Sequence, residues 1–115
     1  MSVTIYHNPR CSKSRQTLAL LEDQGITPDV VLYLDTPPDA ARVRELVGML
    51  GLSSARDLMR KGEAVYKDLG LKDVTDEDAL IRAMADNPIL IERPIVVKGG
   101  AARLGRPPEG VLEIL

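Results

Sequence analysis

The order in which strand and helix patterns follow one another most constrains the fold of this 115-residue chain. Residues 3–6 alternate in polarity and are rich in β-formers, so they predict a strand. A helical pattern begins at Ser12 and ends at Gly25, where a glycine commonly closes a helix. Residues 29–34 form a nearly continuous apolar run, which is typical of a strand covered on both faces. The chain therefore begins with a strand, a helix and a second strand.

The other end of the chain predicts a hairpin and a closing helix. Residues 95–97 predict a strand, the glycine pair 99–100 a tight turn, and residues 102–104 the returning strand. The segment 107–109 then begins a final helix that runs to Leu115.

The middle of the chain is helical. Residues 36–39 predict a helix start with prolines in the first turn, and apolar residues at positions 43, 46, 47 and 50 give that helix one buried face. Three shorter helical patterns follow, at residues 53–60, 64–69 and 75–86. The stretch from about residue 36 to 88 thus holds more helix than one crossover between strands requires.

A strand-helix-strand unit followed by a hairpin and a helix is the arrangement of a thioredoxin or glutaredoxin core. We therefore expect an α/β fold with a mixed four-stranded sheet. Residues 1–115 are expected to form a single domain, with a helical insertion at about 36–88.

Composition excludes several classes of function. The 15 basic and 17 acidic residues give a net charge of −2, which argues against a chain that coats nucleic acid or an anionic membrane. Three tyrosines without phenylalanine or tryptophan nearly exclude a base-stacking surface. No secretory signal and no apolar run of about 20 residues is visible, so we expect a cytoplasmic protein without a membrane partner.

The single cysteine, Cys11, lies between the first predicted strand and helix. One cysteine forms neither an internal disulfide nor a cysteine-based zinc site, so we predict no metal. The alternative is a small buried side chain, but the polar and charged neighbours argue against burial. Unpaired N–H groups at a helix start stabilise a thiolate, and Arg10, Lys13 and Arg15 add positive charge. Cys11 is therefore a candidate nucleophile.

Two further side chains are candidates at this site. Ser14 is placed to donate a hydrogen bond to the sulfur, and His7 to orient the site or exchange protons with it. Each also has an ordinary use, as a first-turn polar residue and as a strand-end imidazole. Ser14 stands where a redox pair needs a second cysteine, and Thr17 where a cysteine phosphatase needs an arginine. The spacing therefore excludes both of these thiol machineries.

Three arginines, Arg60, Arg93 and Arg106, lie beside breaks in the pattern. Arginine suits oxyanions because its planar fork donates two parallel hydrogen bonds. Each alone is an ordinary surface charge, and spacing does not bring the three together. In a thioredoxin-like core, a proline placed like Pro94 is commonly cis and lies against the active thiol.

The sequence resembles the ArsC family, the glutathione- and glutaredoxin-dependent arsenate reductases, along essentially its whole length. The active-site segment is similar over residues 5–15, and the residues that leave the second strand over 33–38. The later similar blocks are residues 58–61, 87–90, 92–97 and 105–109. The segment 11–14 and the end at Leu115 are more similar to the chromosomal branch of the family than to its resistance-operon members.

This resemblance implies an enzyme that reduces arsenate to arsenite. It implies that Cys11 is the nucleophile, that His7 and Ser14 support it, and that Arg60, Arg93 and Arg106 bind the substrate oxyanion. It further implies glutathione as co-substrate, glutaredoxin as a transient partner, no bound cofactor and a monomer.

Two other functions remain open at this point. The related Spx-type regulators share the core, bind RNA polymerase and are not enzymes, but they usually carry a second cysteine where this chain has Ser14, and they lack the block that begins at Arg106. The other alternative is a thiol oxidoreductase that acts on glutathione mixed disulfides.

Overall fold

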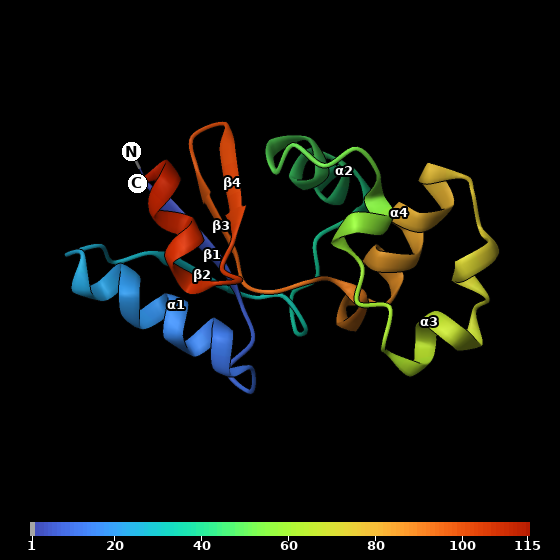
Figure 1. The fold of residues 1–115 in the computed structure, drawn as a ribbon, viewed down its shortest axis with the longest axis horizontal. Coiled ribbons are helices and arrows are strands. Elements are labelled where there is room, and N and C mark those ends of the chain that lie inside the picture. Colours follow the sequence, from blue (N-terminus) through green and yellow to red (C-terminus); the bar gives the residue numbers. More distant parts are fainter. Residues whose placement is uncertain (1) are drawn as a thin grey trace. The chain divides into compact units, whose positions relative to one another are not determined.

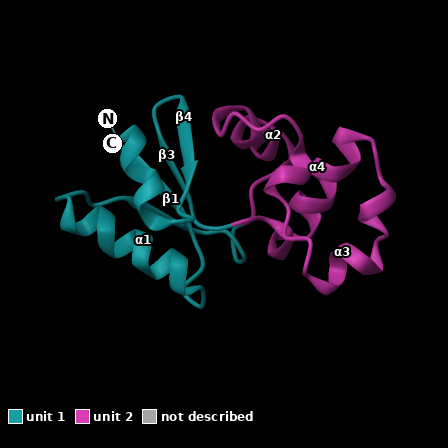
Figure 2. Ribbon diagram, in the orientation of Figure 1, with its two compact units in different colours: residues 1–36, 93–115 teal, residues 37–92 magenta. Residues whose placement is uncertain are grey.

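In the computed structural model, which describes residues 2–115, the chain folds into two units (Figures 1 and 2). The first unit consists of Met1–Thr36 and Arg93–Leu115, and the second of Pro37–Glu92. Both ends of the sequence therefore contribute to the first unit, and the helical middle of the chain forms the second.

The first unit is built on a four-stranded sheet in the order β2-β1-β3-β4. Strand β1 pairs in parallel with β2 and antiparallel with β3, and β3 pairs antiparallel with β4. The elements of this unit are β1 (Val3–His7), α1 (Ser12–Asp23), β2 (Asp29–Leu32), β3 (Ile95–Lys98), β4 (Ala101–Leu104) and the 3-10 helix η4 (Pro108–Ile114). The sheet is mixed, so the predicted thioredoxin-like α/β fold is confirmed.

The core of this unit lies between the sheet and the helices α1 and η4. Its buried side chains come from β1, β3 and both helices, and they are Val3, Ile5, Leu21, Val96 and Val111. Because Ile5, Leu21, Val96 and Val111 are fully buried, α1 and η4 are held against the sheet by aliphatic contacts, in keeping with the scarcity of aromatic residues.

Strand β2 differs from its prediction. The apolar run at residues 29–34 indicates a strand covered on both faces, but Val30 is 46% and Leu32 40% exposed. The physical reason is the strand order, since β2 is an edge strand that pairs only with β1. The strand also ends at Leu32, and a turn follows it.

The start of one helix and the type of another also differ from their predictions. The N-cap of the helix that follows Pro38 is Asp39, whose side chain accepts a hydrogen bond from the N–H of Arg42. The prolines therefore precede this helix and do not occupy its first turn. The closing helix of the chain is η4, a 3-10 helix of seven residues.

The second unit is helical. Its elements are α2 (Ala40–Met49), η1 (Ala55–Leu58), α3 (Ala64–Asp68), η2 (Leu71–Asp73), α4 (Glu77–Asp86) and η3 (Pro88–Leu90). Helices α2 and α4 bury aliphatic side chains such as Leu46 and Met84, and Glu77 accepts a hydrogen bond of 2.7 Å from the N–H of Ala55. No helix among residues 2–115 is long and apolar enough to cross a membrane.

Gly105, directly after β4, is required for steric reasons. A Cβ added at this position would come within 2.7 Å of Pro94 Cγ and closer still to the Thr17 hydroxyl. We expect Gly105→Ala to lower the free energy of unfolding by about 1–3 kcal/mol, because neighbours in a filled site must move. Urea unfolding measures this loss. Gly100→Ala is the matched control, since its added Cβ meets nothing within 4 Å, and equal losses in both variants would contradict the expectation.

Candidate active site

Cys11 lies at the start of α1, as the sequence predicts. It is the N-cap residue of this helix, with extended backbone angles of φ −95° and ψ 122°. A turn leads into it, because the N–H of Cys11 donates to the carbonyl oxygen of Asn8 at 3.0 Å. The carbonyl of Cys11 accepts from the N–H of Arg15, also at 3.0 Å. The thiol is therefore fixed beside the unpaired N–H groups of the first helical turn.

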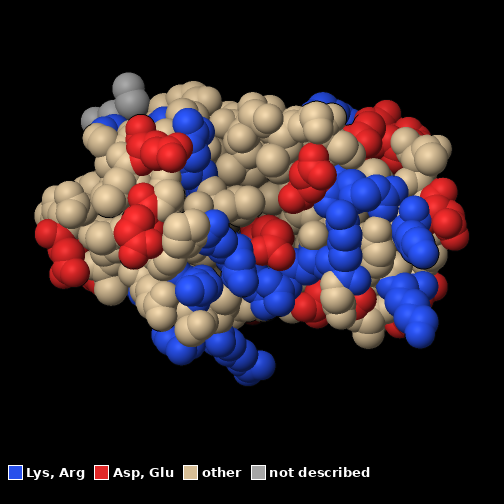
Figure 3. All heavy atoms as spheres, in the orientation of Figure 1, with Lys and Arg blue, Asp and Glu red and all other residues tan. Residues whose placement is uncertain are grey.

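The surroundings of the thiol favour its ionised form. Partial burial alone would raise the pKa of Cys11, but four donors outweigh it and hold the pKa below its usual range. In order of effect, these donors are the N–H of Ser14, the Arg93 side chain, the N–H of Lys13 and the Arg106 side chain. Figure 3 shows Lys and Arg side chains gathered around the start of α1. Cys11 is thus a thiolate over a wider pH range than a free cysteine.

His7 and Ser14 form a buried pair behind the thiol. His7 Nδ1 lies 2.6 Å from Ser14 Oγ, and the same oxygen accepts from the N–H of Asn8 at 3.0 Å. Burial, and next the positive charge of Arg15, lower the pKa of His7, so the imidazole is neutral near pH 7. The Ser14 hydroxyl is therefore engaged with His7, and it is the N–H of Ser14, not the predicted hydroxyl, that favours the thiolate.

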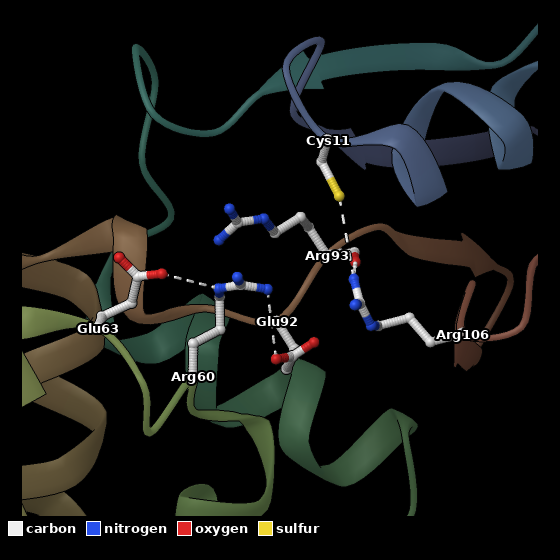
Figure 4. Close-up of polar contacts among 6 residues, drawn as sticks. All are labelled: Cys11, Arg60, Glu63, Glu92, Arg93 and Arg106. Carbon is white, nitrogen blue, oxygen red and sulfur yellow. Dashed lines mark hydrogen bonds and ion pairs between the residues drawn. The ribbon is translucent and has the colours of Figure 1, made fainter.

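Two of the three predicted arginines lie at the thiol. Arg106 Nη1 is 3.9 Å from Cys11 Sγ and donates to the carbonyl oxygen of Arg93 at 3.0 Å. Figure 4 shows the sulfur pointing toward this guanidinium. Both arginines precede a cis-proline, Pro94 and Pro107, and the first of these cis bonds is the one that the fold analogy indicates. Arg93 itself is buried.

Arg60 belongs to the second unit. Its Nε lies 3.2 Å from Glu63 Oε2, and its Nη1 lies 3.5 Å from Glu92 Oε1 (Figure 4). Its N–H donates to the carbonyl oxygen of Leu90 at 2.7 Å. Two carboxylates therefore hold the guanidinium in place, and its membership of the oxyanion site stays a prediction.

Asn8 is a site residue that the sequence did not single out. Its side chain is buried, its Oδ1 accepts from the N–H of Arg10 at 3.0 Å, and its own N–H and carbonyl bond to Ser14 and Cys11. It fixes the turn that carries the thiol. The sequence did contain a signal for this turn, because an asparagine followed by a proline favours turns.

Removing the positive charge of Arg106 tests the electrostatics of the site. Arg106→Gln takes away one donor that lowers the pKa of Cys11, so this pKa should rise toward its usual range. The pH dependence of the rate of alkylation by iodoacetamide reports the titration directly, because the thiolate is the reacting form. Arg103→Gln, which removes a positive charge from β4 that is paired with Glu113, is the control and should leave the midpoint unchanged. Equal midpoints in both variants would contradict the expectation.

The sequence and the fold match known proteins over the whole chain. Residues 6–114 match the ArsC family. An arsenate reductase of Neisseria meningitidis is 53% identical over 114 residues, which are 98% of this chain and 97% of that protein. An arsenate reductase of Haemophilus influenzae is 48% identical over 116 residues, which are 100% of this chain and 100% of that protein. The solved structure of an arsenate reductase from Vibrio cholerae has a TM-score of 0.97 at 59% identity, covering 100% of this chain and 98% of that one.

Sheet order and thiol position define a thioredoxin-like protein whose cysteine stands at the start of the first helix. Within that class, the match over residues 6–114 and the full-length relatives decide the family. The chain belongs to the ArsC family.

Proposed function

We propose that this protein reduces arsenate to arsenite, with Cys11 as the nucleophile. The observation that carries the proposal is the thiol itself, with its lowered pKa and the Arg106 guanidinium 3.9 Å from its sulfur. When a tetrahedral oxyanion reacts with this sulfur, the Arg106 guanidinium lies close enough to balance the negative charge on its oxygens. The arsenate reductases among its relatives support the choice of substrate.

In the first step, the Cys11 thiolate attacks arsenic(V). A sulfur–arsenic bond forms, and one oxygen leaves as water after protonation, so arsenic is not yet reduced. Arg93 and Arg106 hold the remaining oxygens, and Arg60 is proposed to complete this set. His7 and Ser14 act as positioning residues, because their hydrogen bond fixes the turn and the first turn of α1.

Reduction requires two electrons, which one cysteine does not supply through an internal disulfide. We assign them to two external thiols. The glutathione thiolate displaces a second oxygen from arsenic, again as water. The glutaredoxin thiolate then attacks the glutathione sulfur, a disulfide forms, and the electron pair of the broken arsenic–sulfur bond stays on arsenic. Water finally displaces Cys11 from arsenic(III), which releases arsenite and restores the thiol.

A coupled assay tests this proposal. Arsenate-dependent oxidation of NADPH is followed with glutathione, glutathione reductase and glutaredoxin, and we expect turnover that requires every component. In a parallel reaction, a glutathione mixed disulfide replaces arsenate and glutaredoxin is omitted, because glutaredoxin itself reduces such disulfides, and the rate without the protein is subtracted. Activity on the mixed disulfide without activity on arsenate would contradict the proposal and favour a thiol oxidoreductase, and inactivity on both would contradict it as well.

A further inference from the structure

A pocket of about 340 Å³ opens at the carboxyl ends of the parallel strands β1 and β2. It is lined by residues 7–10, at and after the end of β1, and by Leu32, Leu34 and Asp35 at and after the end of β2. In open α/β sheets, ligands bind outside the carboxyl ends of such strands. The volume is at the lower end of the range for small-molecule sites, which begins at about 300 Å³. The active site uses His7 and Asn8 from the wall of this pocket, but it leaves Leu32, Leu34 and Asp35 without a role.

The walls of the pocket combine opposite charges with apolar surface. Arg10 and Asp35 are both exposed, and among residues 2–115 their side chains make no hydrogen bond or ion pair. Leu32 and Leu34 are 40% and 39% exposed, which is unusual for leucines in and beside a strand. A ligand that fits these walls is small, carries one negative and one positive group, and has an aliphatic or peptide chain between its charged end and the rest.

We infer that this pocket binds the amino-acid end of a small zwitterionic peptide thiol, the co-substrate that reduces the arsenic adduct on Cys11. The ligand carboxylate pairs with Arg10, its ammonium group with Asp35, and its chain lies against Leu32 and Leu34. This inference rests on the proposed function, which requires an external thiol.

The position of the pocket allows such a thiol to reach the adduct. Arg10 lines the pocket and immediately precedes Cys11, and consecutive Cα atoms lie about 3.8 Å apart. Cys11 itself does not line the pocket. A tripeptide spans about 10 Å when extended, so we place the thiol of the bound ligand, one residue from its anchored end, within reach of the arsenic on Cys11. Asn8 fixes the turn that joins the pocket to the thiol, because its side-chain and main-chain oxygens accept hydrogen bonds from the N–H groups of Arg10 and Cys11, both at 3.0 Å.

A second hollow of similar volume shows why charge decides the assignment. It measures about 330 Å³ and is lined by residues of α1 and the start of η4. It carries the carboxylates Asp23 and Glu109 and no cation. The carboxylate of an anionic or zwitterionic ligand therefore finds no cation in this second hollow, whereas Arg10 supplies one in the first pocket.

Binding is tested without arsenate and without a reactive thiol. Amide shifts of the isotope-labelled protein are recorded during titration with S-methylglutathione, and we expect saturable shifts at residues 7–10 and 32–35. Arg10→Gln and Asp35→Asn should each weaken binding about tenfold, because each removes one charged partner. The matched controls are Arg103→Gln, on the opposite edge strand β4, and Asp29→Asn, at the other end of β2, and both should bind as the parent does.

Blocking the ligand amine assigns the charges within the pocket. Acetylated S-methylglutathione should bind the parent about tenfold more weakly than the free amine, but bind Asp35→Asn no more weakly than the free amine does. Shifts that do not saturate, shifts centred on the hollow at Asp23, or Arg10→Gln and Asp35→Asn variants that bind as the parent does would overturn the inference.

The proposed function fails separately from this inference. If arsenate is reduced while the KM for glutathione is the same in Arg10→Gln as in the parent, the pocket assignment is wrong and the proposed function stands. If arsenate is not reduced but S-methylglutathione binds as expected, the pocket assignment stands and the proposed function is wrong.

Discussion

Replacing Cys11 by serine is expected to reduce arsenate-dependent turnover at least about 1000-fold, because the hydroxyl is a weak nucleophile at neutral pH. The donors around the sulfur favour a thiolate, and they do not lower the much higher pKa of an alcohol far enough to replace it. The side chain is only partly buried, so the free energy of unfolding should change by about 0.5 kcal/mol or less. The coupled NADPH assay measures the first effect and urea unfolding the second.

Ser12→Ala is the matched control for this loss. Ser12 is exposed and directly follows the nucleophile, so the control removes one hydroxyl from the same turn and leaves the thiol in place. It should retain the parent rate. Substantial turnover by Cys11→Ser would show that the sulfur does not attack arsenic and would overturn the mechanism.

The elements of the fold follow largely from local sequence patterns. The helix from Ser12 ends where Gly25 takes a positive φ of 77°, and the hairpin turns at the predicted glycine pair. The exposure of β2 is the clear exception. An apolar run does not say whether a strand lies at the centre or the edge of a sheet, because that depends on which strands pair.

The site was predictable only in its local part. The thiol at the start of α1 is a property of neighbouring residues, so the sequence alone indicates it. Arg106 lies 95 positions from Cys11, and only the pairing of β1 with β3 and of β3 with β4 brings its loop to the sulfur. The partner of the Ser14 hydroxyl was missed for a different reason: spacing gives proximity to the sulfur, but the packing of the His7 ring places its Nδ1 2.6 Å from this hydroxyl.

The largest expected loss of stability comes from Arg56, in the second unit. Its guanidinium donates to Tyr66 Oη at 2.7 Å, to the carbonyl oxygen of Leu71 at 2.9 Å, and to the carbonyl oxygen of Val74. It thereby ties η1 to α3 and to the segment around η2. Arg56→Met keeps an aliphatic stem but removes all three hydrogen bonds, although the carbonyl oxygen of Leu71 still accepts from the N–H of Val74 at 3.1 Å. We expect a loss of about 3 kcal/mol in the free energy of unfolding. Urea unfolding measures it.

The part of the chain that loses stability in Arg56→Met distinguishes the loss of these hydrogen bonds from a general effect of removing a positive charge. Hydrogen exchange should speed up most at the amides of residues 71–74, because two of the lost hydrogen bonds end on this segment. Arg82→Met, at an exposed position of α4, removes the same charge and should cost about 0.5 kcal/mol or less. Tyr66→Phe removes one of the three acceptors and should lie between the two variants. If Arg56→Met were no more destabilising than Arg82→Met, the three hydrogen bonds would add nothing to stability beyond what water supplies to the same carbonyl groups.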